Sequence, residues 1–232
     1  MIKINQGFYL EKRLRMKIHH VSEKPSILNK FLAEIRDKNI QKDSLRFRTN
    51  IERMGEIISY ELSKTLKYKD DNIITPLGTK KMKTLDDQVV LASILRAGLP
   101  LHMGVLRIFD NAENAFISAY RKHTDHSDDF EIQIDYIASP SIADKTLVLV
   151  DPMLATGKSL VGVYNKINNL GKPKSVHIIS LIGSKEGIEY LQKNMPEDSH
   201  LWIADFDSHL NDKGYIIPGL GDAGDLAYGK KL

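Results

Sequence analysis

The second half of the chain alternates short apolar runs with segments in which apolar residues recur at helical spacing. The apolar runs, which are typical of buried strands, occupy residues 88–95, 115–120, 146–150, 176–182 and 201–206. Helical spacing follows at residues 99–109, 160–170 and about 186–193. The apolar positions of the first two are Leu99, Met103, Leu106 and Phe109, and Leu160, Val163, Tyr164, Ile167 and Leu170. Strands that alternate with helices predict an α/β fold with a mainly parallel, five-stranded sheet and helices on both faces.

The first part of the chain has helical spacing without intervening strands. Ser26 can cap a short helix that carries Ile27, Leu28, Phe31, Leu32 and Ile35 on one side. A longer helix is predicted from about Asp43 to Leu66, with Arg46 and Arg48 near its start as solvated or paired side chains. We therefore expect an N-terminal helical arm over residues 1–66.

Two segments predict hairpins that extend from the core. Residues 67–87 are polar and carry the turn signal Pro76-Leu77-Gly78. After the strand at 115–120, the polar stretch 122–129 is expected to be a mobile loop, and the alternation from Ile132 to Tyr136 predicts the return strand of a flexible arm. A metal site built from His123, Asp125 and His126 is the weaker interpretation of that loop, and we predict no metal ligands there.

Composition narrows the class of protein. The 232 residues, 42% of them hydrophobic, suffice for one domain, with an α/β core at 88–206 and a tail at 207–232. The net charge of +3 is too small to indicate nucleic-acid binding. The chain has no cysteine, no signal peptide and no apolar run near the ~20 residues of a membrane span, so we expect a cytoplasmic protein that binds no membrane.

The stretch Thr146 to Ser159, TLVLVDPMLATGKS, carries the clearest candidate chemistry. A buried strand ends at Asp151-Pro152, small residues follow, and a helix begins. Backbone N–H groups at such a helix start bind anions, and phosphate is the anion that we expect. The carboxylate of Asp151 suits ribose hydroxyls or a magnesium-bound diphosphate.

Two other interpretations of this stretch stay open at this point. Gly157-Lys158-Ser159 ends like the P-loop motif GxxxxGK(S/T), but Pro152 stands where that motif requires its first glycine. The stretch can also be an ordinary strand-to-helix turn without a ligand.

Further candidates lie elsewhere in the chain. Arg96 follows a strand at the edge where open α/β sheets bind ligands, and its guanidinium can hold a phosphate through two N–H donors. Tyr215, Ile216, Ile217 and Tyr228 are expected to anchor the tail through apolar contacts. Gly219, Gly221 and Gly224 allow close approach of the tail backbone to a flat ligand. Asp205 and Asp207, and the neighbours His19 and His20, are expected to be structural or solvated.

Three motifs carry a resemblance to a known family. DPMLATG within the stretch above, ILRAGL at Ile94 to Leu99 and YIIPGLGDAGD at Tyr215 to Asp225 occur in the order found in type I phosphoribosyltransferases. The first is similar to the phosphoribosyl-diphosphate (PRPP) loop of the uracil phosphoribosyltransferases. The resemblance covers the chain from about Ile18 to its end.

The resemblance implies transfer of the phosphoribosyl group of PRPP to uracil, giving UMP and diphosphate. It implies catalytic roles for Arg96, Arg121 and Asp222. It assigns PRPP to Arg96, Arg121, Asp151, Pro152, Met153, Leu154, Ala155, Thr156, Gly157, Lys158, Ser159 and Asp222. It assigns uracil to Ile216, Gly221, Asp222 and Ala223, largely through backbone atoms.

Partners follow from the same resemblance. We expect Mg²⁺ bound with PRPP, and a homodimer or higher homo-oligomer in which the helical arm helps. Some relatives bind GTP and are activated by it, but the sequence does not locate a GTP site. A non-catalytic homologue that binds uracil or UMP and regulates a partner is the alternative, as is an enzyme for another base. Lys158 and Leu226 depart from the residues usual in the family and put substrate affinity in question.

Overall fold

The computed structural model describes residues 16–123 and 130–231. A central sheet runs in the order β1-β10-β9-β7-β4-β5-β6, with β8 added beside β9. Its strands are β1 (Lys17–His20), β4 (Val89–Leu95), β5 (Glu113–His123), β6 (Phe130–Ala138), β7 (Thr146–Val150), β8 (Met153–Leu154), β9 (Ser175–Ser184) and β10 (His200–Asp207). All the strand pairs of this sheet are parallel except β5–β6.

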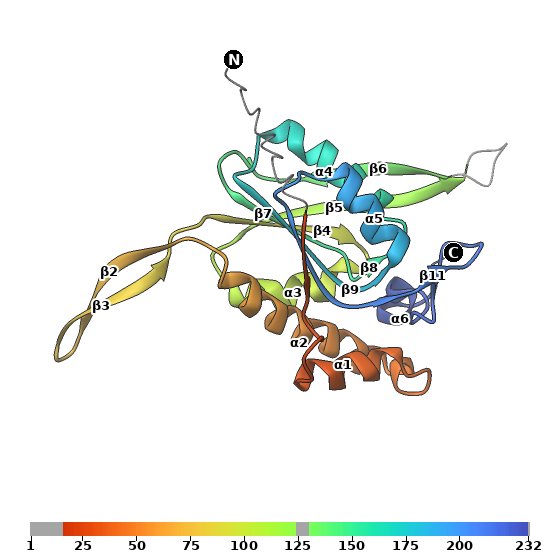
Figure 1. Cartoon of the computed structure of the whole chain (residues 1–232), viewed down its shortest axis with the longest axis horizontal. Coiled ribbons are helices and arrows are strands. Elements are labelled where there is room, and N and C mark those ends of the chain that lie inside the picture. The colour runs from red at the N-terminus through yellow and green to blue at the C-terminus, as the bar shows by residue number, and fades with distance from the viewer. Residues whose placement is uncertain (1–15, 124–129, 232) are drawn as a thin grey trace, which may run out of the picture.

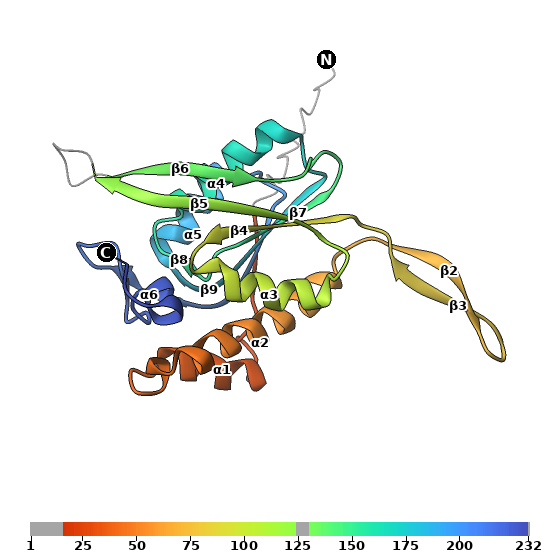
Figure 2. The same ribbon diagram turned by 180° about the vertical axis from the view of Figure 1, so that it is seen from behind.

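Helices cover both faces of this sheet. Figures 1 and 2 show α1, α2 and α3 on one face and α4 and α5 on the other. The helices are α1 (Ile27–Arg36), α2 (Ser44–Ser63), α3 (Gly98–Ile108), α4 (Lys158–Ile167), α5 (Lys185–Asn194) and α6 (Ala223–Tyr228), with short 3₁₀ turns η1 (Ile40–Lys42) and η2 (Asn168–Leu170). The predicted α/β class and the five parallel core strands are confirmed, and β6 is the predicted return strand.

The edge strand β1 was not predicted, because four residues are too few to show a period. It pairs in parallel with β10. The ring of His19 stacks on Trp202 with 3.7 Å between ring centroids, and its Nε2 lies 3.1 Å from Nδ1 of His200. The structural role expected for His19 is thus confirmed.

The two predicted helices of the arm form, with small differences at their ends, whereas residues 1–15 of the predicted arm lie outside the described residues. Ser26 caps α1, and the side chain of Asn29 accepts a hydrogen bond of 2.7 Å from the Ser26 N–H. Asp43 caps α2, which ends at Ser63 rather than Leu66. The buried side of α2 carries Phe47, Ile51, Met54, Ile58 and Leu62.

Three predicted apolar positions of the helices are wrong, because Ile27, Met103 and Leu170 are exposed. Met103 is 41% exposed, whereas Leu101 and Val105 are buried. The reason is that α3 lies between the sheet and α2: a Cβ at Gly104 would come 2.1 Å from the Glu52 carbonyl oxygen. Leu170 is also exposed, because α4 ends at Ile167 and η2 turns the chain away from the core.

The predicted hairpin at 67–87 consists of β2 (Tyr68–Thr75) and β3 (Gly78–Leu85), which pair only with each other in the described part of the chain. Figure 1 shows it projecting from the body, away from the β5–β6 arm. Most of the mobile loop predicted at 122–129, including Asp125 and His126, lies outside the described residues. Within the described ranges, no helix is both long and apolar enough to cross a membrane.

Candidate active site

The loop between β7 and α4 forms a small hollow at the carboxyl edge of the sheet. It is lined by Asp151, Met153, Leu154, Ala155, Thr156, Gly157, Ser159 and Leu160. Gly157 has φ +74, and a Cβ there would lie 2.9 Å from the Gly187 carbonyl oxygen. Only glycine meets both conditions easily, so this residue lets α4 begin directly at the hollow.

Two serines of β9 hold this loop in place. Ser180 Oγ donates to the Asp151 carbonyl at 2.7 Å. Ser184 Oγ donates to the Ala155 carbonyl at 2.6 Å and accepts from the Gly187 N–H at 2.9 Å. We did not predict either residue; the signal available was two serines four positions apart, hence on one face, in an otherwise apolar strand.

Pro152 is one predicted ligand residue that does not line the hollow. It is buried, and its carbonyl accepts hydrogen bonds from the N–H groups of Leu181 and Ile182 at 3.1 and 3.0 Å. Leu154 is also buried, with its side chain in the core. Pro152 therefore anchors the loop to β9, and Leu154 can reach a ligand only through its backbone.

The carboxylate of Asp151 bonds to the backbone of the loop that follows it. Its Oδ1 accepts a hydrogen bond of 3.1 Å from the Met153 N–H. Lys158 is the first residue of α4 and is half-buried. The loop thus brings one carboxylate and one ammonium group to the same end of the sheet as its backbone N–H groups.

Arg96 follows β4 at the same edge, after a cis peptide bond. A Cβ at Gly98 would lie 3.1 Å from the Val150 carbonyl oxygen, so the turn packs against the end of β7. Arg96 Nη2 donates to Asp225 Oδ1 at 3.0 Å, and the side chain stays 44% exposed. Arg96 therefore faces solvent while an acid from the tail holds one end of its guanidinium.

The tail folds over this edge through β11 (His209–Leu210), β12 (Ile216–Ile217) and α6. Ile216, Leu220 and Ala223 are buried, whereas Gly221 is exposed and has φ +98. A Cβ at Gly224 would lie 3.9 Å from Arg96 Nη2. Two of the predicted uracil contacts, Ile216 and Ala223, can thus offer little more than backbone atoms.

Other tail predictions are partly wrong. Tyr215 and Tyr228, expected as apolar anchors, are 43% and 40% exposed. Their polar hydroxyl ends allow this, and the ring of Tyr228 lies under the Arg48 guanidinium instead, 5.8 Å from its centroid. Leu226 packs against the core, which explains an apolar residue at that position.

Asp222 caps α6 and is half-buried. Its Oδ1 accepts from the Asp225 N–H at 3.0 Å, and its Oδ2 lies 3.3 Å from Lys231 Nζ. Burial opposes the charged form, but the hydrogen bond from Asp225 and the charge of Lys231 outweigh it and lower the pKa of Asp222. The carboxylate is therefore ionised at neutral pH and faces the Arg96 side of the tail through Gly224.

Arg121 lies within β5, not after it as predicted, because the strand continues to His123 as one side of the arm. Its backbone pairs with Ile132 of β6. Ser118 pairs with Leu95, so Arg121 lies three residues beyond the end of β4. The arm thus extends past the edge that carries Arg96.

Asp205 and Asp207 have the structural role that was expected. Both bind Arg36, with Nη2 to Asp205 Oδ2 and Nη1 to Asp207 Oδ2 each at 2.8 Å. They are therefore not an acid–base pair.

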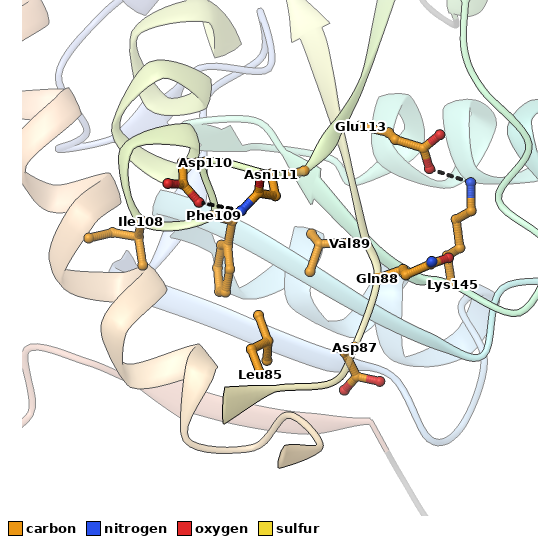
Figure 3. Close-up of a pocket in the computed structure, with 11 residues that line it drawn as sticks. Leu85, Asp87, Gln88, Val89, Ile108, Phe109, Asp110, Asn111, Glu113 and Lys145 are labelled. Carbon is orange, nitrogen blue, oxygen red and sulfur yellow. Dashed lines mark hydrogen bonds and ion pairs between the residues drawn. The ribbon is translucent and has the colours of Figure 1, made fainter. Parts of the chain in front are cut away.

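A larger cavity of about 590 Å³ opens at the opposite edge of the sheet. Figure 3 shows Leu85, Val89 and Phe109 converging there, with the Asp110–Asn111 and Glu113–Lys145 pairs at its rim. None of the predicted site residues lines it. It is separate from the candidate active site.

Comparison with known proteins matches this arrangement. The uracil phosphoribosyltransferase family model matches residues 21–230. The chain is 50% identical to the uracil phosphoribosyltransferase of Porphyromonas gingivalis over 94% of this chain and 100% of that protein. Identity to the enzyme of that name from Thermococcus gammatolerans is 36%, over 93% of this chain and 94% of that one.

A solved structure supports the same relationship. The AQ2163 protein of Aquifex aeolicus superposes with a TM-score of 0.82 at 29% identity, over 91% of this chain and 98% of that chain. The match of the family model to nearly the whole chain includes the PRPP loop, the Arg96 turn and the tail. The chain therefore belongs to the uracil phosphoribosyltransferase family.

Proposed function

We propose that this protein transfers the phosphoribosyl group of PRPP to uracil, giving UMP and diphosphate. One observation carries the proposal: the PRPP loop, the Arg96 turn and the tail, separated along the chain, meet at one edge of the sheet. The contact of the Arg96 guanidinium with Asp225 and the packing of Gly98 against Val150 support this convergence.

The residues divide the substrate between them. The segment from Met153 to Ser159, at the N-terminus of α4, wraps the 5′-phosphate of PRPP. Asp151 binds the ribose hydroxyls, and Arg96 and Arg121 bind the diphosphate. Uracil lies against the backbone of Ile216 and of Gly221 to Ala223, with Asp222 on the PRPP side.

Catalysis rests on positioning and charge. The ribose carbon loses diphosphate and gains oxocarbenium character while uracil N1 attacks and gives up its proton to the departing diphosphate or to solvent. Negative charge therefore grows on the leaving group. Two guanidinium groups stabilise that charge, and the loop fixes the distance between ribose and base. We assign no general base among these residues.

Mg²⁺ fits the site as a companion of the substrate. No group of three or more His, Cys, Asp or Glu side chains in the described residues is arranged to hold a metal. Mg²⁺ commonly binds through one or two carboxylates together with substrate phosphates, and Asp151 supplies such a carboxylate oxygen. Bound there, Mg²⁺ supplies charge neutralisation at the diphosphate.

We also propose that the protein is a homo-oligomer, at least a dimer. The β2–β3 hairpin supports this, because an isolated two-stranded hairpin is marginally stable in water and Ile74 is 87% exposed and Leu77 fully exposed. The cavity in Figure 3 is lined in part by the apolar side chains of Leu85, Val89, Ile108 and Phe109. A second copy thus offers an apolar surface that complements the exposed side chains of the hairpin.

The oligomer proposal is tested by mass in solution. Light scattering of the wild type should give a dimer or larger, and the double variant Ile74→Asp/Leu77→Asp should shift it toward monomer. If the mass of the variant equals that of the wild type, the hairpin is not part of the interface between subunits. The part of the helical arm in dimerisation, the binding of GTP and a cytoplasmic location stay expectations drawn from the sequence.

The activity is tested with purified protein, PRPP and Mg²⁺, and uracil, cytosine, hypoxanthine or orotate in parallel. UMP from uracil alone is the expected result. Binding of uracil or UMP without product from any base would instead favour the non-catalytic alternative.

A further inference from the structure

Arg36, at the last turn of α1, connects the helical arm to the tail through a dense set of hydrogen bonds. Its Nη1 donates to Asp207 Oδ2 at 2.8 Å and to the Gly219 carbonyl at 3.0 Å. Its Nη2 donates to Asp205 Oδ2 at 2.8 Å and to Asp207 Oδ1 at 3.1 Å. One guanidinium thus joins three elements: α1, the end of β10 and the tail.

Asp207 completes a clamp on Gly219. Its Oδ2, already bound to Arg36, also accepts a hydrogen bond of 3.0 Å from the Gly219 N–H. Both polar groups of the Gly219 backbone are therefore held, the carbonyl by Arg36 and the N–H by Asp207. A single peptide position held at both ends cannot shift along the chain or rotate without breaking one of the two bonds.

Gly219 stands where the tail turns toward the base. It has φ +55, and a Cβ there would come 2.2 Å from the Ile216 carbonyl oxygen. It lies between Ile216 and the Gly221-Asp222-Ala223 segment, the residues proposed above to contact uracil through their backbone. Any displacement of Gly219 therefore moves both halves of that surface relative to each other.

The Arg36–Asp207 pair of this clamp is largely shielded from solvent, so its hydrogen-bond geometry tolerates little change. The Arg36 side chain is 19% exposed and that of Asp207 only 9%. Breaking a buried pair by removing one partner leaves an uncompensated charge, whereas a bidentate Arg–carboxylate pair fixes direction as well as distance. Recognition by backbone atoms needs placement within about 0.5 Å, which such a support can supply.

We propose that Arg36 is a positioning residue for base recognition: through Asp207 it holds Gly219, and thereby sets the affinity of the tail for uracil. This rests on the proposed function of the tail. Arg36 does not line the hollow of the PRPP loop, so we expect its main effect on the base rather than on the 5′-phosphate of PRPP.

The test is steady-state kinetics of Arg36→Met and Asp207→Asn in the full-length protein. We expect the KM for uracil to rise about tenfold or more, as for the loss of a charged hydrogen bond, and the KM for PRPP to change less than about threefold. Arg36→Lys, which keeps the charge but not the fork, should recover only part of the loss.

Arg46→Met is the matched control. Arg46 makes a similar two-bond pair, with Glu34 at 3.0 and 2.8 Å, but this pair joins α2 to α1 and not to the tail. It should lower thermal stability while leaving the KM for uracil unchanged. An equal rise in both KM values for Arg36→Met, or no rise, would overturn the positioning role.

Hydrogen exchange gives a readout that does not depend on activity. In Asp207→Asn, the amides of residues 215–223 should exchange faster than in wild type while those of β7 and β9 do not. Unchanged exchange there would also overturn the inference. An inactive wild type would instead count against the proposed function, since exchange still reports the clamp.

Discussion

Arg96 Nη2 lies 3.0 Å from Asp225 Oδ1, although the two residues are 129 positions apart in the chain. The pair joins the turn after β4 to α6 in the tail. Because the Arg96 side chain is 44% exposed, an incoming diphosphate can reach the same guanidinium from solvent. Arg96 is thus held in place before substrate binds.

Removing this guanidinium should damage the chemical step. Arg96→Ala is expected to lower kcat/KM for PRPP by about 10²–10³, the usual loss for one preorganised donor to a developing negative charge. The measurement is initial rate against PRPP at saturating uracil. A loss below tenfold would show that Arg96 does not bind the diphosphate.

Asp225→Asn separates the ion pair from the guanidinium itself. The amide keeps an oxygen acceptor for Arg96, and an exposed pair contributes at most about 1 kcal/mol, so kcat/KM should change by less than about fivefold. If Asp225→Asn were as slow as Arg96→Ala, the ion pair between Arg96 and Asp225 would be essential, and not the guanidinium N–H groups that face solvent.

Ser184→Ala should loosen the PRPP loop. Ser184 is fully buried, and the change leaves the Ala155 carbonyl and the Gly187 N–H without their hydroxyl partner. We expect a loss of about 1–3 kcal/mol in the free energy of unfolding and a higher KM for PRPP. Chemical denaturation and PRPP kinetics measure the two effects.

Ser59 provides the control for this change. It is equally buried, on α2, but its Oγ has no hydrogen-bond partner among the residues that the structure describes. Ser59→Ala should therefore leave both the unfolding free energy and the KM for PRPP close to wild type. A similar loss in the two variants would mean that any buried serine, and not the anchored loop, accounts for the result.

Lys158→Ala tests the cation at the start of α4. A positive charge there costs roughly 0.3–1 kcal/mol in helix stability. Attraction to a phosphate at ~4 Å is about 4 kcal/mol at an effective dielectric near 20, before desolvation. We expect a higher KM for PRPP, with a difference from wild type that shrinks as salt is added.

The thermal midpoint of the same variant without substrate gives the second half of this test. It should stay level or rise, because the unfavourable helix-end charge is gone. An unchanged KM for PRPP at low salt would show that the ammonium group does not reach the phosphate.

Stability should fall as the pH is lowered from about 7 to 5, in part because of His177. Burial, and then the nearby His200 and His19, lower the pKa of His177 to about 3, while Asp87 opposes them. Between that value and the ordinary 6.5, the unfolded chain binds a proton that the folded protein does not. The unfolding free energy therefore rises with pH through this window. The stability that His177 costs at low pH is fully regained above the window.

His177→Gln should flatten this dependence. Glutamine retains an oxygen that can accept the hydrogen bond which Trp202 Nε1 donates to His177 at 3.2 Å. The drop in thermal midpoint between pH 7 and pH 5 should then be smaller than in wild type. Glu34, whose pKa is held at about 2 mainly by its hydrogen bond from Arg46, is ionised throughout that range and does not interfere.

Local pattern was enough for the parts of this protein in which neighbours in sequence are neighbours in space. Apolar periodicity located the five core strands. Ser26 and Asp43 indicated where two helices begin, because a capping side chain bonds to the backbone within the first turn. The strand, proline and small residues around Asp151 likewise predicted the loop, since its shape depends on a few consecutive residues.

Tertiary structure alone decided which distant residues meet. Periodicity predicts one buried face, so it missed that α3 lies between two layers and exposes Met103 rather than Leu101. It could not pair Arg96 with Asp225, or Arg36 with Gly219 across 183 positions, because such contacts depend on how the layers stack and not on local spacing. The sequence by itself therefore determined the elements and the phosphate loop, whereas packing determined how the base-binding tail is held against them.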